Sequence, residues 1–386
     1  MANPFTLNDD HIAVRDLVQR VARERVRPRA DEIDRLAEYP QDMFELLREL
    51  GLFTLPFPAE FGGSESTLSA CIAIEELGRV CYNTAYLLAV QWTPFGAILA
   101  AGTPEQKTKL LPGLASGEIR AAIAVTEPQS GSDVAGIRTR AVRTAGGFRI
   151  DGSKIWCTGA AYADVIVVAA KTEVEGKQSV ELFIVEKGAS GLTVGRKEDK
   201  IGGRGVPSSE LFFENLEVAE SSLLGTPGRG FKHVMEAFNT ARPIIAARGV
   251  GLAQGAIDHA VEFVQNRSTF GQKVSDYQGI RWMLADMAMQ TEAARNLVYR
   301  AAGLVDAGVT GKELAPYAAM AKCFATDTAM KVAVDAVQLF GASGVSGEFP
   351  INRYMRDAKL LQIVEGTNQI QRNIISNALL GRPAKR

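Results

Sequence analysis

The sequence predicts an α+β protein in which a helical region, a β-domain and a second helical region follow one another along the chain. Three observations support this order. Apolar residues recur at helical spacing in the first region, short β-branched runs separated by glycine-rich turns fill the middle, and long helical patterns return at the end. We place the domains at residues 1–119, 120–228 and 229–386.

The first region contains clear helix signals. Apolar residues between positions 12 and 21 recur at three- and four-residue steps, which predicts an amphipathic helix. The run Thr103-Pro-Glu-Gln106 combines a cap residue, a first-turn proline and a capping glutamine, so it predicts a helix start. Pro112 is expected to open a further short helix. This part of the chain therefore predicts several helices joined by short connections.

The middle and last regions differ in the spacing of their apolar residues. Segments 164–170, 180–185 and 210–214 are rich in β-branched or aromatic residues, and the glycine-rich stretch 224–230 is a natural boundary. Segment 281–305 keeps a helical period, as expected in a bundle of long helices. Because the expected outer face of this segment carries few polar residues, we expect part of its surface to contact another subunit.

Composition excludes several classes of protein. The chain of 386 residues is 46% hydrophobic and 23% charged, and its formal net charge is −1, so no overall field favours nucleic acid or an anionic membrane. We see no apolar run of about 18 residues and expect no membrane-spanning helix. Three scattered histidines predict no metal site, and four widely spaced cysteines indicate a reducing compartment, which we expect to be the cytoplasm.

One glycine pattern resembles a dinucleotide-binding fingerprint but lacks its context. The stretch Gly249-Val-Gly-Leu-Ala-Gln-Gly255 has one residue too many before its last glycine and lies in an alanine-rich helical segment. No acidic residue ends a second strand about 20 residues further on, as a Rossmann unit requires. We interpret these glycines as small residues that permit close helix packing, and we exclude a nicotinamide Rossmann enzyme.

Two neighbouring segments could hold a flat cofactor. Segment 124–133 offers the hydroxyls of Thr126, Ser130 and Ser132, and Gly131 would let a ligand approach the backbone. Further on, the Trp156 ring is followed two residues later by the Thr158 hydroxyl, and in an extended segment such side chains share a face. An aromatic plate beside hydrogen-bond donors suits an isoalloxazine ring. Turn formation and core packing are the alternatives for each segment alone.

Two further segments carry charged residues. Arg267-Ser-Thr-Phe-Gly271 combines an arginine, which suits a pyrophosphate, with hydroxyls and an aromatic side chain, although a cation also stabilises an ordinary helix C-terminus. Glu365 follows the apolar run 360–364 and precedes Gly366, on a short link between helices. Apolar neighbours would raise its pKa and make it a base near neutrality. A solvated or helix-capping glutamate is the alternative.

Five segments in series resemble the acyl-CoA dehydrogenase family, and the resemblance covers nearly the whole chain. They are Val125-Thr-Glu-Pro-x-x-Gly-Ser-Asp133, Trp156-x-Thr158, Arg267-x-Thr-Phe-Gly271, Gln338-Leu-Phe-Gly341 and Glu365-Gly-Thr-x-Gln-Ile-Gln371. The resemblance implies an N-terminal helical domain, a middle β-barrel-like domain and a C-terminal four-helix bundle. It also implies FAD as cofactor, a homotetramer built as a dimer of dimers with FAD at a subunit interface, and an electron-transferring flavoprotein as redox partner.

The resemblance assigns roles residue by residue. It implies that FAD is bound by Val125, Thr126, Gly131, Ser132, Trp156, Thr158, Arg267, Thr269, Phe270, Gln278, Gln338, Gly341, Thr367 and Gln369. Of these, Trp156 would flank the ring and Thr158 would point toward N5, whereas Arg267, Thr269 and Phe270 would reach the FAD of a neighbouring subunit. The substrate would contact Ser132, Asn239, Arg242 and Gly366. The sequence departs from the family pattern at two positions. Ala342 stands where many members have a second glycine, and Ala241 stands where some members carry the catalytic base, so Glu365 has no rival for that role.

The implied activity is α,β-desaturation of an acyl-CoA thioester to the trans-2-enoyl-CoA, as in the β-oxidation of fatty acids. Glu365 would abstract the α-proton, flavin N5 would accept the β-hydride, and the electrons would pass to the flavoprotein partner. The segment Ala89–Trp92 near the expected pocket floor has no charged residue, which favours an uncharged acyl chain.

Three alternatives stay open at this stage. The first is a same-fold acyl-CoA oxidase or flavin monooxygenase, the second a non-catalytic acyl-CoA- or FAD-binding scaffold, and the third a purely structural helical protein.

Overall fold

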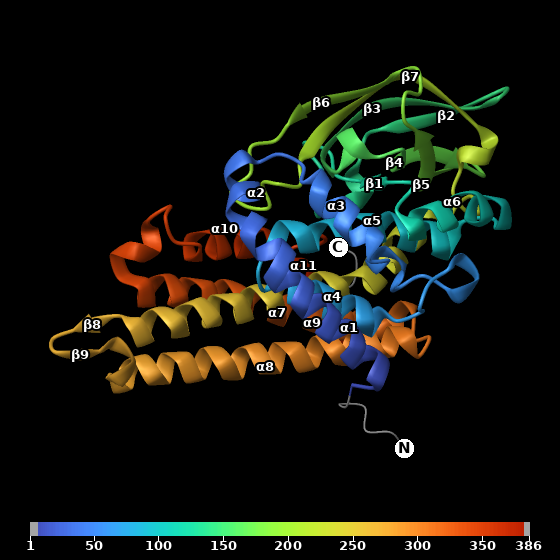
Figure 1. Ribbon diagram of the computed structural model, residues 1–386. Helices are drawn as coiled ribbons and strands as arrows, with labels where there is room; N and C mark the ends of the chain where they lie inside the picture. The colour runs from blue at the N-terminus through green and yellow to red at the C-terminus, as the bar shows by residue number, and fades with distance from the viewer. Residues whose placement is uncertain (1–6, 382–386) are drawn as a thin grey trace.

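The computed structural model describes residues 7–381, and it has the expected order of helices, sheet and helices (Figure 1). The sheet lies at the top of the view, the long C-terminal helices at the bottom, and N-terminal helices between them. The N-terminal helices are α1 (Asp9–Val21), α2 (Ala30–Leu36), α3 (Gln41–Glu49), α4 (Thr67–Gly78), α5 (Tyr82–Ala101) and α6 (Pro104–Ser116).

The start of α6 confirms one local prediction and corrects another. The Gln106 N–H donates to the Thr103 hydroxyl at 3.2 Å, and the Thr103 N–H donates to the Gln106 side chain at 2.9 Å, which completes the capping box. The prediction that Pro112 opens a separate helix is wrong, because α6 continues through it to Ser116.

A curled, mixed β-sheet forms the middle region. Its strands are β1 (Ala121–Ala124), β2 (Arg140–Thr144), β3 (Gly147–Thr158), β4 (Val165–Val174), β5 (Lys177–Glu186), β6 (Leu192–Lys197) and β7 (Ser208–Ala219). The order is β1-β4-β2-β3-β7-β6, with β5 paired to β4; β4 runs parallel to β1 and β2, and the other pairings are antiparallel.

The first six residues of strand β4, Val165–Ala170, are all apolar and buried. Its residues alternate between the two faces of the sheet. Val165 and Val167 join the core shared with the helices, whereas Ile166 and Val168 join a separate core inside the sheet. Both faces of β4 are therefore buried, and the sheet is fixed against the helical regions.

The C-terminal region consists of long helices and a small hairpin. Its elements are α7 (Gly230–Asn266), β8 (Ser268–Thr269), β9 (Gln272–Lys273), α8 (Gln278–Asp306), α9 (Gly311–Phe340), α10 (Ile351–Leu361) and α11 (Asn368–Leu380). Helices α7, α8 and α9 pack together, and α10 and α11 pack on α9. Figure 1 shows the β8–β9 hairpin at the far end of α7 and α8, away from the sheet.

The glycines of the false dinucleotide motif lie inside α7 and permit close packing against α4. A Cβ on Gly251 would lie 2.3 Å from the carbonyl oxygen of Glu75, and a Cβ on Gly255 would lie 2.1 Å from that of Arg79. No side chain fits at these positions without moving a helix. This confirms the packing interpretation.

Within residues 7–381, helix α5 is long and apolar enough to cross a membrane by length and composition, although polar residues interrupt its apolar sequence. Its 20 residues reach a mean hydropathy of 1.3, which satisfies a test of length and composition. However, 72% of that window is buried inside the protein. Because α5 packs on α4 and α7, its apolar character is that of a core helix.

Candidate active site

Glu365 lies on the loop between α10 and α11, in a backbone conformation that is rare for a non-glycine residue. Its φ is +54°, and the following Gly366 has φ +91°. Such left-handed residues cost energy and are frequent at functional sites. The side chain is 18% exposed, and its Oε2 atom is buried without a hydrogen-bond partner within residues 7–381. The loop thus holds a mostly dry carboxylate with one oxygen available.

Three buried cations surround this carboxylate. Nη2 of Arg248 lies 3.9 Å from Oε1 of Glu365, and Lys322 and Arg242 add weaker attraction. Burial raises the pKa of Glu365 to about 7, although the three cations oppose the rise. Glu365 can therefore exchange a proton near neutral pH. Sequence reasoning singled out Arg242 and missed Arg248 and Lys322, although an arginine within the apolar run 244–250 was a usable signal.

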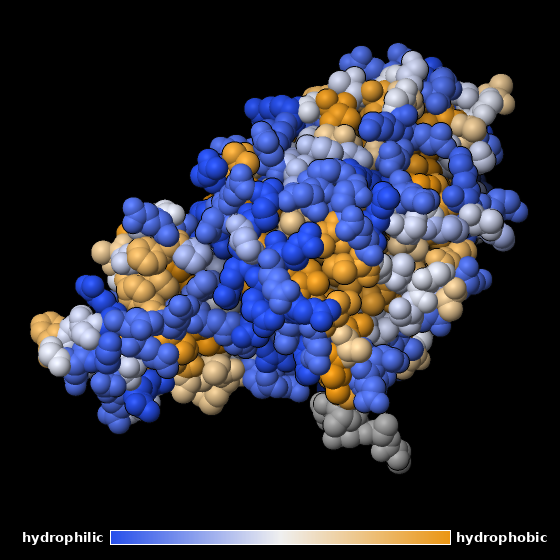
Figure 2. Space-filling view, viewed as in Figure 1, coloured by the Kyte–Doolittle hydropathy of each residue, from blue (hydrophilic) through white to orange (hydrophobic). Residues whose placement is uncertain are grey.

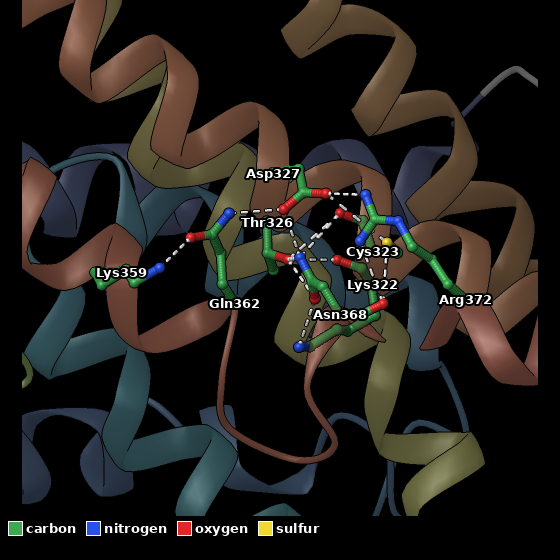
Figure 3. A network of polar contacts seen from close by, with 8 residues as sticks. All are labelled: Lys322, Cys323, Thr326, Asp327, Lys359, Gln362, Asn368 and Arg372. Atoms are coloured by element: carbon green, nitrogen blue, oxygen red, sulfur yellow. Dashed lines mark hydrogen bonds and ion pairs between the residues drawn. The ribbon is translucent and has the colours of Figure 1, made fainter. Parts of the chain in front are cut away.

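A polar network attaches the loop to α9 (Figure 3). Nζ of the buried Lys322 on α9 donates to the Gly366 carbonyl and to Oδ1 of Asn368, both at 2.9 Å. Asp327 accepts from Gln362 and Asn368 at 2.7 Å and from Arg372 at 2.6 Å. Burial lowers the pKa of Lys322 to about 7. Both ends of the loop are thereby attached to one helix, which restricts the position of Glu365.

The residues predicted for the substrate side meet near Glu365, with the exception of Ser132. Arg242 and Asn239 are buried on α7, and the Arg242 guanidinium donates to the Asn239 side chain. A Cβ on Gly366 would lie 3.8 Å from Nη2 of Arg242 and only 2.7 Å from Nε2 of Gln371. Because Gly366 has no side chain, the space next to Arg242 and Gln371 stays free.

A buried ion pair shapes the segment after β1. Carboxylate oxygens of Glu127 accept from the Thr139 N–H at 2.9 Å and from Nζ of Lys154 at 2.7 Å, and Lys154 also donates to the Val125 carbonyl at 3.0 Å. Burial alone would raise the pKa of Glu127, but these hydrogen bonds lower it to about 2. The pair, which sequence reasoning missed, fixes the backbone of Val125 and Thr126.

The predicted ring platform lies at an irregularity of β3. Trp156 has φ +62° at a β-bulge and is 50% exposed, whereas Cys157 is buried in the core of the sheet. The Thr158 hydroxyl hydrogen-bonds with the Ser208 hydroxyl at 2.9 Å and with the Tyr86 hydroxyl at 3.3 Å. Gly131 and Ser132 are exposed, and a Cβ on Gly131 would meet nothing within 4 Å. These residues leave an open surface beside polar groups.

The remaining predicted cofactor residues, except Thr367 and Gln369 beside the Glu365 loop, form a second group. Arg267, Thr269 and Phe270 lie in and next to the β8–β9 hairpin, with Phe270 99% exposed at φ +47°. The Tyr277 hydroxyl donates to the Thr269 carbonyl at 2.9 Å, next to Gln278 at the start of α8. Gln338 and Gly341 lie at the end of α9, which packs there on α7 through the stacked rings of Phe340 and Phe263. Thr367 caps α11, and Gln369 is exposed on its first turn. Within one chain, the residues around Trp156 and the residues around the β8–β9 hairpin therefore lie in different parts of the fold.

The fold and the site define a helix–sheet–helix protein with a buried carboxylate of near-neutral pKa and an open platform for a flat cofactor. Within residues 7–381 no cluster of His, Cys, Asp or Glu could hold a metal ion.

Comparison with known proteins identifies the family. The N-terminal, middle and C-terminal domain models of acyl-CoA dehydrogenase match residues 8–118, 122–216 and 228–380. A curated relative, the cyclohex-1-ene-1-carbonyl-CoA dehydrogenase of Geobacter metallireducens, is 43% identical over 97% of this chain and 99% of its own length. The chain belongs to the acyl-CoA dehydrogenase family and is an oxidoreductase.

Solved structures agree with this assignment. The butyryl-CoA dehydrogenase of Megasphaera elsdenii superposes with a TM-score of 0.93 at 36% identity, covering 97% of this chain and 99% of that one. A chain of the structure described as the electron transferring flavoprotein of Acidaminococcus fermentans gives 0.92 at 39% identity, with coverages of 98% and 100%. The FAD complex of PigA gives 0.91 at 28% identity, with coverages of 98% and 100%. The cofactor of this protein is FAD.

Proposed function

We propose that the protein catalyses α,β-desaturation of an acyl-CoA thioester to the trans-2-enoyl-CoA, with Glu365 as the base that removes the α-proton. One observation carries this proposal: a mostly buried carboxylate with a pKa raised to about 7 and an unpartnered oxygen lies on a strained loop. A general base works best when its pKa lies near the operating pH. The names of the dehydrogenase relatives support a CoA thioester as the substrate class.

The exposed platform is suited to FAD. We assign the ring to Trp156 and Thr158, and the neighbouring part of the cofactor to Val125, Thr126, Gly131 and Ser132, because these groups combine an exposed aromatic surface, hydroxyls and an open backbone. Bound FAD supplies the acceptor for the β-hydride. The Tyr86 hydroxyl, which touches Thr158, links this platform to the helical region that faces Glu365.

The chain's own residues then perform the acid–base part of the reaction. Glu365 accepts the α-proton, and its backbone N–H would polarise the thioester carbonyl as negative charge develops there. Arg242 and Asn239 lie beside the loop and would position the thioester. The network of Lys322 and Asn368 holds the loop so that the carboxylate meets the α-carbon in one orientation.

We further propose a homotetramer, a dimer of dimers, in which Arg267, Thr269 and Phe270 at the β8–β9 hairpin reach the FAD of a neighbouring subunit. Figure 1 shows the hairpin at the far end of α7 and α8, away from the sheet of its own chain, and Arg267 and Phe270 are exposed, which supports their contact with another copy. In Figure 2 the surface over the long C-terminal helices, at the lower left, is mostly hydrophilic with small apolar spots. Two large apolar side chains of α8 are nonetheless exposed, Trp282 at 61% and Met289 at 63%, and they support subunit contact. Light scattering of the purified protein tests the tetramer, and a monomer at micromolar concentration would contradict it.

The redox partner and location are part of the same proposal. We expect electrons to leave to an electron-transferring flavoprotein, which the similarity to the Acidaminococcus fermentans structure supports. We propose a cytoplasmic location, because all four cysteines are free and buried in the structure. Cell fractionation tests this location, and recovery in a membrane or secreted fraction would contradict it.

Anaerobic mixing of the purified yellow protein with a panel of straight, branched and cyclic acyl-CoAs tests the function. At least one thioester is expected to bleach the flavin and to yield the enoyl-CoA. Slow reaction of the reduced protein with oxygen supports the dehydrogenase over the oxidase. If no acyl-CoA bleaches the flavin, the proposed function is wrong.

A further inference from the structure

Arg248 on α7 is buried completely, yet half of its guanidinium has no partner. Its side chain is 0% exposed. Nη1 donates to the Tyr82 hydroxyl at 3.2 Å, and the guanidinium lies over the Tyr86 ring, 4.4 Å from its centroid. Nε and Nη2, in contrast, have no hydrogen-bond partner in the part of the chain that the structure describes. A buried, permanently charged group without such partners is costly, so a ligand at this edge would stabilise it.

The free atoms form one edge of the planar group. Nε and Nη2 carry the two parallel N–H bonds that bind a carboxylate in a bidentate manner. Glu365 does not fill this role, because its Oε1 atom lies 3.9 Å from Nη2, beyond hydrogen-bond distance. Glu365 also becomes neutral when it takes a proton, and Arg248 then loses its nearest negative charge.

Position and charge both place this edge between the base loop and the ring platform. Arg248 reaches the base loop through Glu365 and the ring platform through Tyr86, whose hydroxyl contacts Thr158. The cations Arg242 and Lys322 also act on Glu365, so positive groups outnumber the carboxylate at the base. An additional acceptor oxygen, and a negative one most of all, would therefore be stabilised here.

We propose that Arg248 is a specificity residue whose Nε–Nη2 edge binds an oxygen acceptor on the acyl group of the substrate, beyond the carbons that react. The substrate class is then an acyl-CoA with an oxygenated acyl chain, such as a terminal carboxylate or hydroxyl. This inference rests on the proposed desaturation. It also replaces the expectation of an uncharged chain, which considered only the segment Ala89–Trp92 on α5 and not the charge that α7 contributes.

The test compares acyl-CoAs that differ only in the terminal group. Matched sets from butyryl to octanoyl, each as the plain acyl, ω-hydroxyacyl and ω-carboxyacyl thioester, are given to the FAD-loaded enzyme with an artificial electron acceptor. We expect kcat/KM for one oxygenated member to exceed that of its plain partner by about tenfold or more, the factor that one charge-assisted hydrogen bond supplies. Which member is preferred identifies the group that Arg248 binds.

Variants of Arg248 separate recognition from other roles. Removing this cation also raises the pKa of Glu365, so the variants are compared above the acidic limb of the pH profile, where Glu365 is ionised. There, Arg248→Met is expected to bring kcat/KM for the oxygenated member down to that of its plain partner. Arg248→Lys, which keeps the charge without the bidentate guanidinium, is expected to retain only part of the preference. The proposal is overturned if the wild type prefers the plain chain, or if Arg248→Met lowers kcat/KM equally for all three members. The wild-type comparison stands even if the variants do not fold. A wild type that bleaches with no thioester would instead refute the desaturation itself.

Discussion

The pKa of Glu365 gives a quantitative prediction about the pH dependence of the reaction. Burial raises this pKa from the ordinary 4.5 to about 7. The difference corresponds to about 3 kcal/mol of disfavoured ionisation, since one pKa unit is about 1.4 kcal/mol. Because only the ionised form accepts a proton, kcat/KM should fall about tenfold per pH unit below about pH 7 and reach a plateau above it.

The same shift predicts how stability depends on pH. The folded-state pKa lies above the unfolded one, so the protonated carboxyl contributes stability that is fully present below about pH 4.5 and is lost as the pH rises through about 7. Glu365→Gln cannot ionise and avoids this loss. The free energy of unfolding of the variant, relative to wild type, should therefore increase by up to about 3 kcal/mol between these pH values.

Anaerobic flavin reduction across a pH series measures the first effect, and urea unfolding at the two pH extremes measures the second. Glu313→Gln, at an exposed position of α9, is the matched control and should change neither profile. An acidic limb near pH 4.5 would refute the reasoning, because it would mean that the carboxylate is solvated in the working enzyme.

Three other changes test separate parts of the structure. Lys322→Met removes the hydrogen bonds to Gly366 and Asn368, so turnover should fall about tenfold or more while FAD stays bound. The acidic limb of the pH profile should also move to higher pH, because a cation near Glu365 is lost. Unchanged turnover would contradict the role of the network. Gly251→Ala places a Cβ 2.3 Å from a carbonyl oxygen of α4 and should cost about 1–3 kcal/mol in thermal unfolding, whereas the control Gly279→Ala, with nothing within 4 Å, should cost nothing. Trp156→Ala should lower the FAD content of the purified protein, and full occupancy with an unchanged flavin spectrum would show that this ring is not the platform.

Periodicity and turn chemistry predicted the fold well because they act locally. The capping box at Thr103 and the β-branched run of β4 are both readable from neighbouring residues. Pro112 misled the prediction, because a proline in a helix interior is disfavoured but can be tolerated when surrounding contacts hold the helix. The bulge at Trp156 also escaped prediction, since nothing in the residue types marks a break in the alternation of β3.

The site was predicted only where its residues stand in a motif. Glu365 and Gly366 could be found from the apolar run before them and from the family resemblance. Arg248 and Lys322 come from two other helices, more than 40 residues before Glu365 along the chain, and act on it only through tertiary packing. Their effect on the pKa depends on burial and distance, which sequence spacing does not contain.

The most direct test of the account is the first turnover of Glu365→Gln, followed by stopped-flow flavin absorbance with a thioester that the wild type desaturates. The account predicts a yellow variant that retains FAD, because the substituted amide has nearly the same size and the platform lies elsewhere. Its bleaching should be slower by about 10²–10⁴-fold, the range expected when a positioned base is lost. Bleaching faster than about a tenth of the wild-type rate would show that another group removes the α-proton.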